Sequence, residues 1–191
     1  AVARVLRDSD PLIAAEAARA IHDVPIVEAQ TGLADLLPTL ITSETVDFTP
    51  VRWEVFDNVP VLSSEELNSH PVFERDPDET LELNGFLVAA GGRDEYASRM
   101  TGRIVPTIDG GHQFAITSDD HSSLYIWPEG RPDERKQIAF LDQWTPLDDW
   151  ESRPGQVSSP IQMKAGEAWI VEARHGEGGG GDHLAIGWKE P

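Results

Sequence analysis

From residue 51 to its end, the chain consists of short apolar segments separated by turn-forming residues. The segments are rich in β-branched and aromatic side chains, and Gly, Pro or Asp lies between them. Such segments favour β-strands, and many short strands in succession are typical of a sandwich or barrel. We therefore expect a mainly β fold, with strands over Val51–Phe56, Glu82–Val88, Arg99–Val105, His112–Thr117, Ser123–Trp127, Gln137–Phe140, Pro160–Met163, Ala168–Ala173 and Leu184–Trp188. Short helical turns are expected over Asp94–Met100 and Pro146–Ser152.

The first 45 residues follow a different pattern. Asp8–Pro11 is a helix-start motif, and the apolar residues of Leu12–Ile21 fall on one helical face. A second apolar segment, Leu33–Ile41, is interrupted by a proline. Two short helices of this kind resemble one unit of a HEAT-type repeat, which buries its apolar face only by stacking on a neighbour. We expect a HEAT-like helical hairpin at 1–45, a linker at 46–50 and a β-sandwich domain at 51–191.

The charge of the chain limits the classes of molecule that it is expected to bind. It has 34 acidic and 15 basic residues, a formal net charge of -19. Nucleic acids and anionic membrane surfaces require a basic face, so neither is expected as a partner, whereas cations suit such a chain. No apolar run approaches the ~20 residues that span a bilayer, and without cysteine there is no disulfide and no thiolate zinc site.

The chain begins at Ala1 rather than Met, and no signal peptide is visible. We expect it to be a module of a longer secreted protein, accompanied by other domains of that protein. An extracellular, periplasmic or cell-surface location follows from this expectation.

Two adjacent carboxylates, Asp119 and Asp120, lie between two strand-like segments, Gln113–Ile116 and Leu124–Trp127. The Ser and Asp residues around the pair favour a turn at a strand end. Such a pair can be part of a solvated turn, or it can bind a hard cation such as calcium, which takes carboxylate and carbonyl oxygens together. The residues alone leave both interpretations open.

Four parts of the chain resemble a PA14 domain in the order that the family has them. They are Arg99–Pro106, Gly111–Asp120 with Ser123–Ile126, Ala165–Gly179, and Leu184–Trp188. The resemblance implies an antiparallel β-sandwich of PA14 type, a fold that in many members is a carbohydrate-binding module of adhesins and glycosidases. In sugar-binding members an adjacent Asp pair, joined by a cis peptide, holds a calcium ion that in turn holds sugar hydroxyls. Asp119 and Asp120 match that pair, although many bacterial relatives have Gly where this chain has His121.

A second loop, His175–His183, offers further oxygen atoms to such an ion. Four consecutive glycines allow close backbone approach, and Glu177 and Asp182 bracket them. The alternative is a flexible hairpin loop. With calcium as the cofactor and a glycan or polysaccharide as the partner, we predict metal ligands at Asp119, Asp120, Glu177 and Asp182, and sugar contacts at His121, Trp127, Trp144, His175, Gly179, Gly180 and His183.

Other chemistries are compatible with the residues. His121, His175 and His183 could form a zinc site with Asp119 or Asp182. Adjacent carboxylates could support glycoside hydrolysis, although neighbours on a strand point to opposite faces, and no nucleophile elbow or P-loop is present. We expect a non-catalytic, calcium-dependent carbohydrate-binding module involved in adhesion, with a structural or protein-interaction module as the alternative. Exposed tryptophans would stack on sugar rings, and Trp53, Trp169 and Trp188 are expected in the core.

Overall fold

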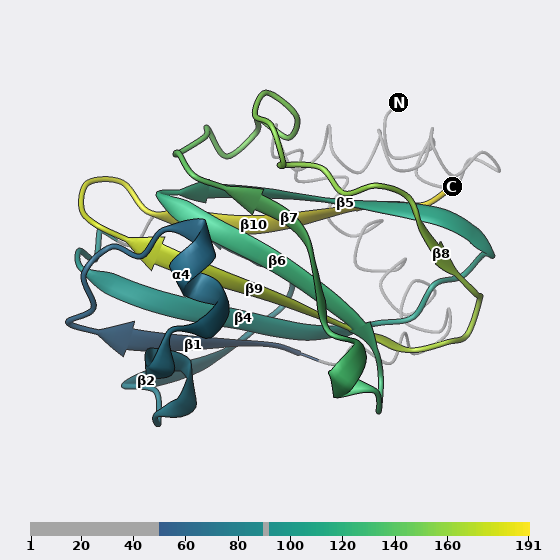
Figure 1. The fold of residues 1–191 in the computed structure, drawn as a ribbon, viewed down its shortest axis with the longest axis horizontal. Helices are drawn as coiled ribbons and strands as arrows, with labels where there is room; N and C mark the ends of the chain where they lie inside the picture. Colours follow the sequence, from purple (N-terminus) through teal and green to yellow (C-terminus); the bar gives the residue numbers. More distant parts are fainter. Residues whose placement is uncertain (1–49, 90–91) are drawn as a thin grey trace, which may run out of the picture. The chain divides into compact units, whose positions relative to one another are not determined.

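Two antiparallel sheets face each other in the computed structural model, which describes residues 50–89 and 92–191 (Figure 1). The larger sheet has the strand order β2-β1-β4-β9-β6-β7. Its strands are β1 (Val51–Asp57), β2 (Glu79–Leu83), β4 (Tyr96–Ile104), β6 (His121–Pro128), β7 (Lys136–Leu141) and β9 (Trp169–Glu177). The smaller sheet has the order β3-β10-β5-β8, with strands β3 (Leu87–Ala89), β5 (Gly110–Asp119), β8 (Ile161–Met163) and β10 (His183–Lys189).

The main core lies between the two sheets. Side chains alternate between the faces of a strand, so every second residue of each long strand points inward. Met100, Leu124 and Val171 from the larger sheet, and Ile116 and Leu184 from the smaller one, are almost fully buried in this cluster. Burying one such side chain stabilises the fold by roughly 1.5–3 kcal/mol. This core fixes the two sheets, and therefore the loops at their ends.

A second apolar cluster covers the outer face of the larger sheet. Helix α4 (Ser64–Ser69) packs there on β6 and β9, and the 3-10 helix η1 (Pro71–Glu74) follows it (Figure 1). A capping box starts α4: Ser63 Oγ accepts from the Glu66 N–H at 3.3 Å, and Glu66 Oε2 accepts from the Ser63 N–H at 2.9 Å. A further 3-10 helix, η2 (Pro132–Glu134), lies between β6 and β7. No helix in the described part of the chain is long and apolar enough to cross a membrane.

The mainly β fold predicted from the sequence is confirmed, with several local differences. The single strand predicted over Glu82–Val88 is wrong, because the chain turns at Asn84–Phe86 and enters the other sheet. The helical turn predicted over Asp94–Met100 is also wrong, since β4 begins within it, and Pro146–Ser152 contains only turns and bends. Trp169 is buried in the core as predicted, whereas Trp188 is 38% exposed.

The predicted helical hairpin at 1–45 and most of the linker at 46–50 lie outside the described residues. The described residues belong to one compact unit of the chain, Thr49–Pro191.

Candidate metal centre

The candidate site forms where the chain crosses twice between the sheets at the same end of the sandwich. Strand β5 of the smaller sheet ends at Asp119, and β6 of the larger sheet begins at His121. Asp120 is the single residue of this first crossing. The glycine-rich segment makes the second crossing, from β9 to β10. His121 pairs with Gly176, and Asp119 pairs with His183. The strand register therefore brings the two crossings together.

Three carboxylates gather at these crossings. One oxygen each from Asp119, Asp120 and Glu177 lies within 4.8 Å of the other two, a grouping that could hold a metal ion. The peptide bond between Asp119 and Asp120 is cis, as the family resemblance implies. The Gly178 N–H donates to Asp120 Oδ2 at 3.1 Å, which ties the glycine-rich loop to the pair.

Glu177 is the most unusual member of the group, because its side chain is completely buried. Neither of its oxygens has a partner at ordinary hydrogen-bond geometry within the described ranges, although His175 Nε2 lies 3.8 Å from Oε2. Burial raises the pKa of Glu177 to about 8, and the negative charges of Asp120, Asp119 and Asp182 add to the rise, whereas the Gly179 N–H lowers this pKa somewhat. Burial and the Asp120 carboxylate likewise raise the pKa of Asp119. A divalent cation would supply the positive charge that this group lacks, so the residues present fit such an ion.

Asp182 lies beside this group rather than in it. Its carboxylate is buried and accepts from the Gly92 N–H at 2.7 Å and from the Tyr96 hydroxyl at 3.1 Å. Asp182 thus connects the glycine-rich loop to the start of β4. It is not one of the three residues whose oxygens lie within 4.8 Å of one another, and its role as a metal ligand stays a prediction.

Asp94 strengthens the same connection, and the sequence did not single it out. Its Oδ1 accepts from the Gly180 N–H at 3.2 Å, and the Glu95 N–H donates to the Gly178 carbonyl at 3.1 Å. Gly179 and Gly180 themselves are exposed at the tip of the loop. Because Asp94 reaches the loop from a different crossing of the chain, no local sequence pattern indicates its position.

The histidines of the predicted site make different contacts, and among the described residues only His175 lies against a grouped carboxylate, with Nε2 3.8 Å from Glu177 Oε2. His175 is fully buried, and its ring bridges the Asp119 carbonyl at 2.6 Å and Ser98 Oγ at 3.4 Å. Burial lowers the pKa of His175 to about 4, so it is neutral and holds the backbone of Asp119. Burial also lowers the pKa of His183. The Ser122 hydroxyl bonds the Ser118 hydroxyl, so the side chain of the preceding residue, His121, lies on the opposite face of β6. No metal-binding group in the described residues includes a histidine.

Two exposed apolar residues belong to segments that contact the strand ends of the site. The Thr145 N–H donates to the Ser118 carbonyl at 2.9 Å, so the backbone beside Trp144, whose side chain is 54% exposed, lies close to the residue that precedes the Asp pair. Val61, 43% exposed, contacts Gly178. Val61 was not predicted, since only the tertiary fold brings it here.

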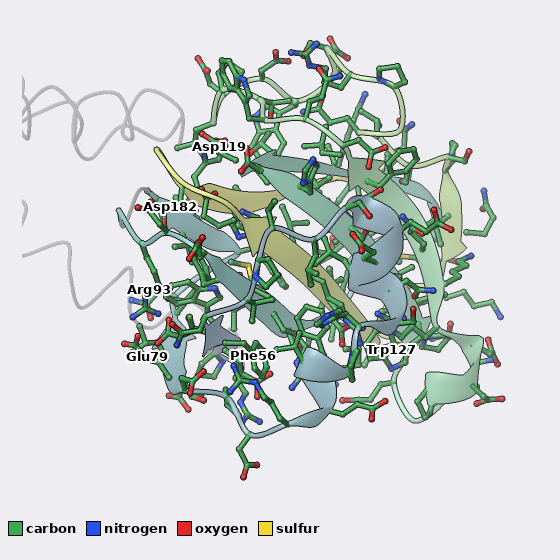
Figure 2. The ribbon with its side chains drawn as sticks, turned by 60° about the vertical axis from the view of Figure 1, so that its left-hand side comes forward. Phe56, Glu79, Arg93, Asp119, Trp127 and Asp182 are labelled. Carbon is green, nitrogen blue, oxygen red and sulfur yellow. The ribbon has the colours of Figure 1, made fainter. Side chains whose placement is uncertain are left out.

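Trp127 is not brought to the site. It lies seven residues beyond Asp120, about 23 Å along β6 at ~3.3 Å per residue. Figure 2 shows Trp127 well separated from Asp119. The Arg135 guanidinium lies 6.0 Å from its ring, so Trp127 belongs to the opposite end of the sandwich.

Comparison with known proteins supports the fold. No family model matches the chain. The PA14 domain of the MpAFP antifreeze protein superposes with a TM-score of 0.55 at 13% identity, covering 74% of this chain and 82% of that one. An anti-sigma factor domain-containing protein from Clostridium clariflavum gives 0.50 at 20% identity, covering 74% and 42%. The described residues thus form a PA14-like antiparallel β-sandwich.

A sequence relative is found in mouse. N-acetyl-beta-glucosaminyl-glycoprotein 4-beta-N-acetylgalactosaminyltransferase 1 is 30% identical over 99 residues, which are 49% of this chain. The match spans only 10% of the mouse protein's length.

Proposed function

We propose that this domain is a calcium-dependent carbohydrate-binding module. The observation that carries the proposal is the buried carboxylate of Glu177, whose oxygens have no partner at ordinary hydrogen-bond geometry among the described residues and which is grouped with two further carboxylates. Calcium takes 6–8 oxygen ligands and accepts carboxylates, backbone carbonyls and waters. Asp119, Asp120 and Glu177 would hold the ion, and exposed carbonyls at Gly179 and Gly180 would complete its shell.

The surroundings of the carboxylates suit a sugar. A bound calcium ion supplies open coordination positions for two vicinal hydroxyl groups. Trp144 and Val61 would contact the apolar faces of the ring, since aromatic faces bind such surfaces well. The mouse relative is by name a glycosyltransferase of glycoproteins, and the short match suits an accessory module of a larger protein. A glycan partner and an extracellular or cell-surface location, where calcium is abundant, are parts of this proposal.

Calorimetric titration of the 1–191 chain against a panel of glycans tests this function. We expect binding in calcium that disappears in chelator and in Asp120→Asn. Asp148→Asn is the matched control, because Asp148 is an exposed loop carboxylate outside the group. Sugar binding that persists in chelator, or in Asp120→Asn, would refute the mechanism.

A second candidate function is purely structural. The bonds from Gly178 to Asp120 and from Gly92 to Asp182 join separate loops, so an ion here could serve only to stabilise them. In that case calcium raises the melting temperature while no glycan in the panel binds.

A further inference from the structure

A row of buried polar side chains lies between the core and the metal centre. Three cross-strand neighbours on β4, β9 and β6 form this polar row, and each of them is completely buried: Ser98, His175 and Ser122. Two residues further from the metal centre on the same face, Met100 and Leu124 belong to the apolar core. Burying a hydroxyl or an imidazole costs free energy unless it is hydrogen-bonded, so the bonds of the polar row indicate what it does.

His175 gives its single N–H to the backbone of the Asp pair. Its Nε2 lies 2.6 Å from the carbonyl oxygen of Asp119, and its Nδ1 lies 3.4 Å from Ser98 Oγ. A carbonyl oxygen can only accept, so the hydrogen is on Nε2, and Nδ1 accepts from the Ser98 hydroxyl. The 3.8 Å between Nε2 and Glu177 Oε2 is too long for a hydrogen bond, so the Glu177 carboxylate stays available to an ion.

The second carbonyl of the pair is held from the same side. The Ser118 hydroxyl donates to the Asp120 carbonyl at 3.3 Å and lies 2.7 Å from Ser122 Oγ. Since Ser118 has one hydrogen to donate, the Ser122 hydroxyl donates to Ser118. Buried donors therefore hold both carbonyls of the Asp pair, while one carboxylate oxygen of each aspartate lies within 4.8 Å of a Glu177 oxygen.

We propose that His175 is a positioning residue that sets the affinity of the metal centre for calcium and its preference for calcium over magnesium. This inference rests on the proposed function and concerns the ion of the same site. Groups that orient metal ligands commonly change metal affinity about 10–100-fold when they are removed. Magnesium binds oxygen at about 2.1 Å and calcium at about 2.4 Å, so the smaller ion requires the carboxylates to move inward. A backbone held at both carbonyls resists that movement, and His175 makes the shorter of the two bonds.

The test titrates the metal-free 1–191 chain with calcium chloride and, separately, with magnesium chloride, by calorimetry. His175→Leu fills a similar volume without an N–H, so the Asp119 carbonyl is no longer held. We expect the Kd for calcium to rise about tenfold and the Kd for magnesium to change less, which lowers the preference for calcium. His175→Gln keeps an N–H near the position of Nε2, and we expect it to restore most of the calcium affinity.

His112 provides the matched control, because it is a second completely buried histidine with the same kind of bonds. Its Nε2 lies 3.0 Å from the Ile108 carbonyl oxygen, and its Nδ1 accepts from the Trp188 indole N–H at 3.0 Å. It lies seven residues before Asp119 on β5, about 23 Å away at ~3.3 Å per residue. His112→Leu should therefore lower the free energy of unfolding, as His175→Leu does, and leave both metal affinities unchanged.

A smaller deletion keeps the inference testable if His175→Leu does not fold, which urea denaturation in chelator shows. Ser98→Ala leaves the ring in place but removes the donor that fixes the hydrogen on Nε2. We expect a loss of calcium affinity smaller than that of His175→Leu, which again exceeds the loss of magnesium affinity.

The outcomes distinguish this inference from the function on which it rests. Wild-type calcium affinity in the folded variants at positions 98 and 175 overturns the role of His175 and leaves the calcium site intact. Equal losses for calcium and magnesium overturn the preference that we assign to His175. A loss in His112→Leu as large as that in His175→Leu attributes the effect to general damage and overturns the positioning role. Absence of calcium binding by the wild-type chain overturns the proposed function together with this inference.

Discussion

Among single residues, Glu177 dominates the electrostatics of the metal centre. Its pKa is about 8 in the folded protein and near 4.5 when unfolded, so between these values the folded state binds more protons. The free energy of unfolding therefore falls as pH rises from about 4.5 to about 8. We predict that Glu177→Gln, measured in chelator, lacks this fall in the free energy of unfolding between about pH 4.5 and pH 8. Chemical denaturation at about pH 5, 7 and 9 measures it, with the exposed Glu167→Gln as control.

Calcium should reverse which of the two proteins, the wild type or Glu177→Gln, is the more stable. In chelator above about pH 8, Glu177→Gln is expected to be more stable than the wild type, because it buries no charge. In calcium the wild type becomes the more stable one, since the ion compensates its carboxylate. A variant that gains as much stability from calcium as the wild type would exclude Glu177 from the ligand set.

Tyr96 provides a residue-scale test of the loop connections. Its hydroxyl donates to the buried Asp182 carboxylate, so Tyr96→Phe removes one donor from a buried charge. We predict a loss of about 1–3 kcal/mol in the free energy of unfolding, measured by urea denaturation. Tyr125→Phe is a matched control, because the Tyr125 hydroxyl is buried without a hydrogen-bond partner among the described residues. Equal losses in both variants would contradict the role of the Asp182 bond.

At the scale of elements, the segment before α4 approaches β9 closely at Gly176, where no side chain intervenes. A Cβ at position 176 would lie 2.9 Å from the Leu62 carbonyl oxygen and 3.0 Å from its nitrogen. Gly176→Ala must therefore move this backbone, and with it Val61, which contacts Gly178. We predict a destabilisation of about 1–3 kcal/mol together with weaker calcium binding, measured by denaturation and by calcium titration.

Gly85 offers the matched control for this substitution, since nothing lies within 4 Å of a Cβ there. Gly85→Ala should leave calcium affinity unchanged. If Gly176→Ala also leaves it unchanged, the segment before α4 does not shape the metal centre.

The same elements show what the sequence could predict. Alternation in segments such as Ala168–Ala173 indicated strands correctly, because one buried face imposes a period of two. The segment Glu82–Val88 failed, since its apolar pattern continues while the chain changes sheets. Helix α4 was missed because six residues are too few to show helical periodicity.

Some residues of the site could be predicted from the sequence, and others could not. Asp119, Asp120 and Glu177 were predicted from local pattern and family resemblance, and the structure groups them. Asp94 and Val61 reach the site from other crossings, so only the fold could identify them. Trp127 shows the converse: closeness in sequence to the Asp pair suggested a contact that the length of β6 prevents.

At the scale of the whole molecule, the residues that stabilise the sandwich and the residues of the metal centre lie in different places. The core between the sheets contains none of the grouped carboxylates, which lie at the last residues of β5 and β9 and at the residue between β5 and β6. Variants at the metal centre should therefore alter calcium affinity without unfolding the domain. The acidic charge acts differently, because it is distributed over the entire chain and opposes the compact state everywhere.

This distributed charge predicts how salt and calcium combine. With a net charge of -19, self-repulsion destabilises the folded chain, and raising sodium chloride from about 0.05 M to 0.5 M in chelator should raise the melting temperature by screening it. Calcium adds stability by mass action, about 2.7 kcal/mol at 100 times its Kd. Because the bound ion neutralises the grouped carboxylates of Asp119, Asp120 and Glu177, the gain from salt should be smaller in calcium than in chelator. Calorimetry of both series measures this difference. Equal salt gains in both would mean that the repulsion lies away from the metal centre.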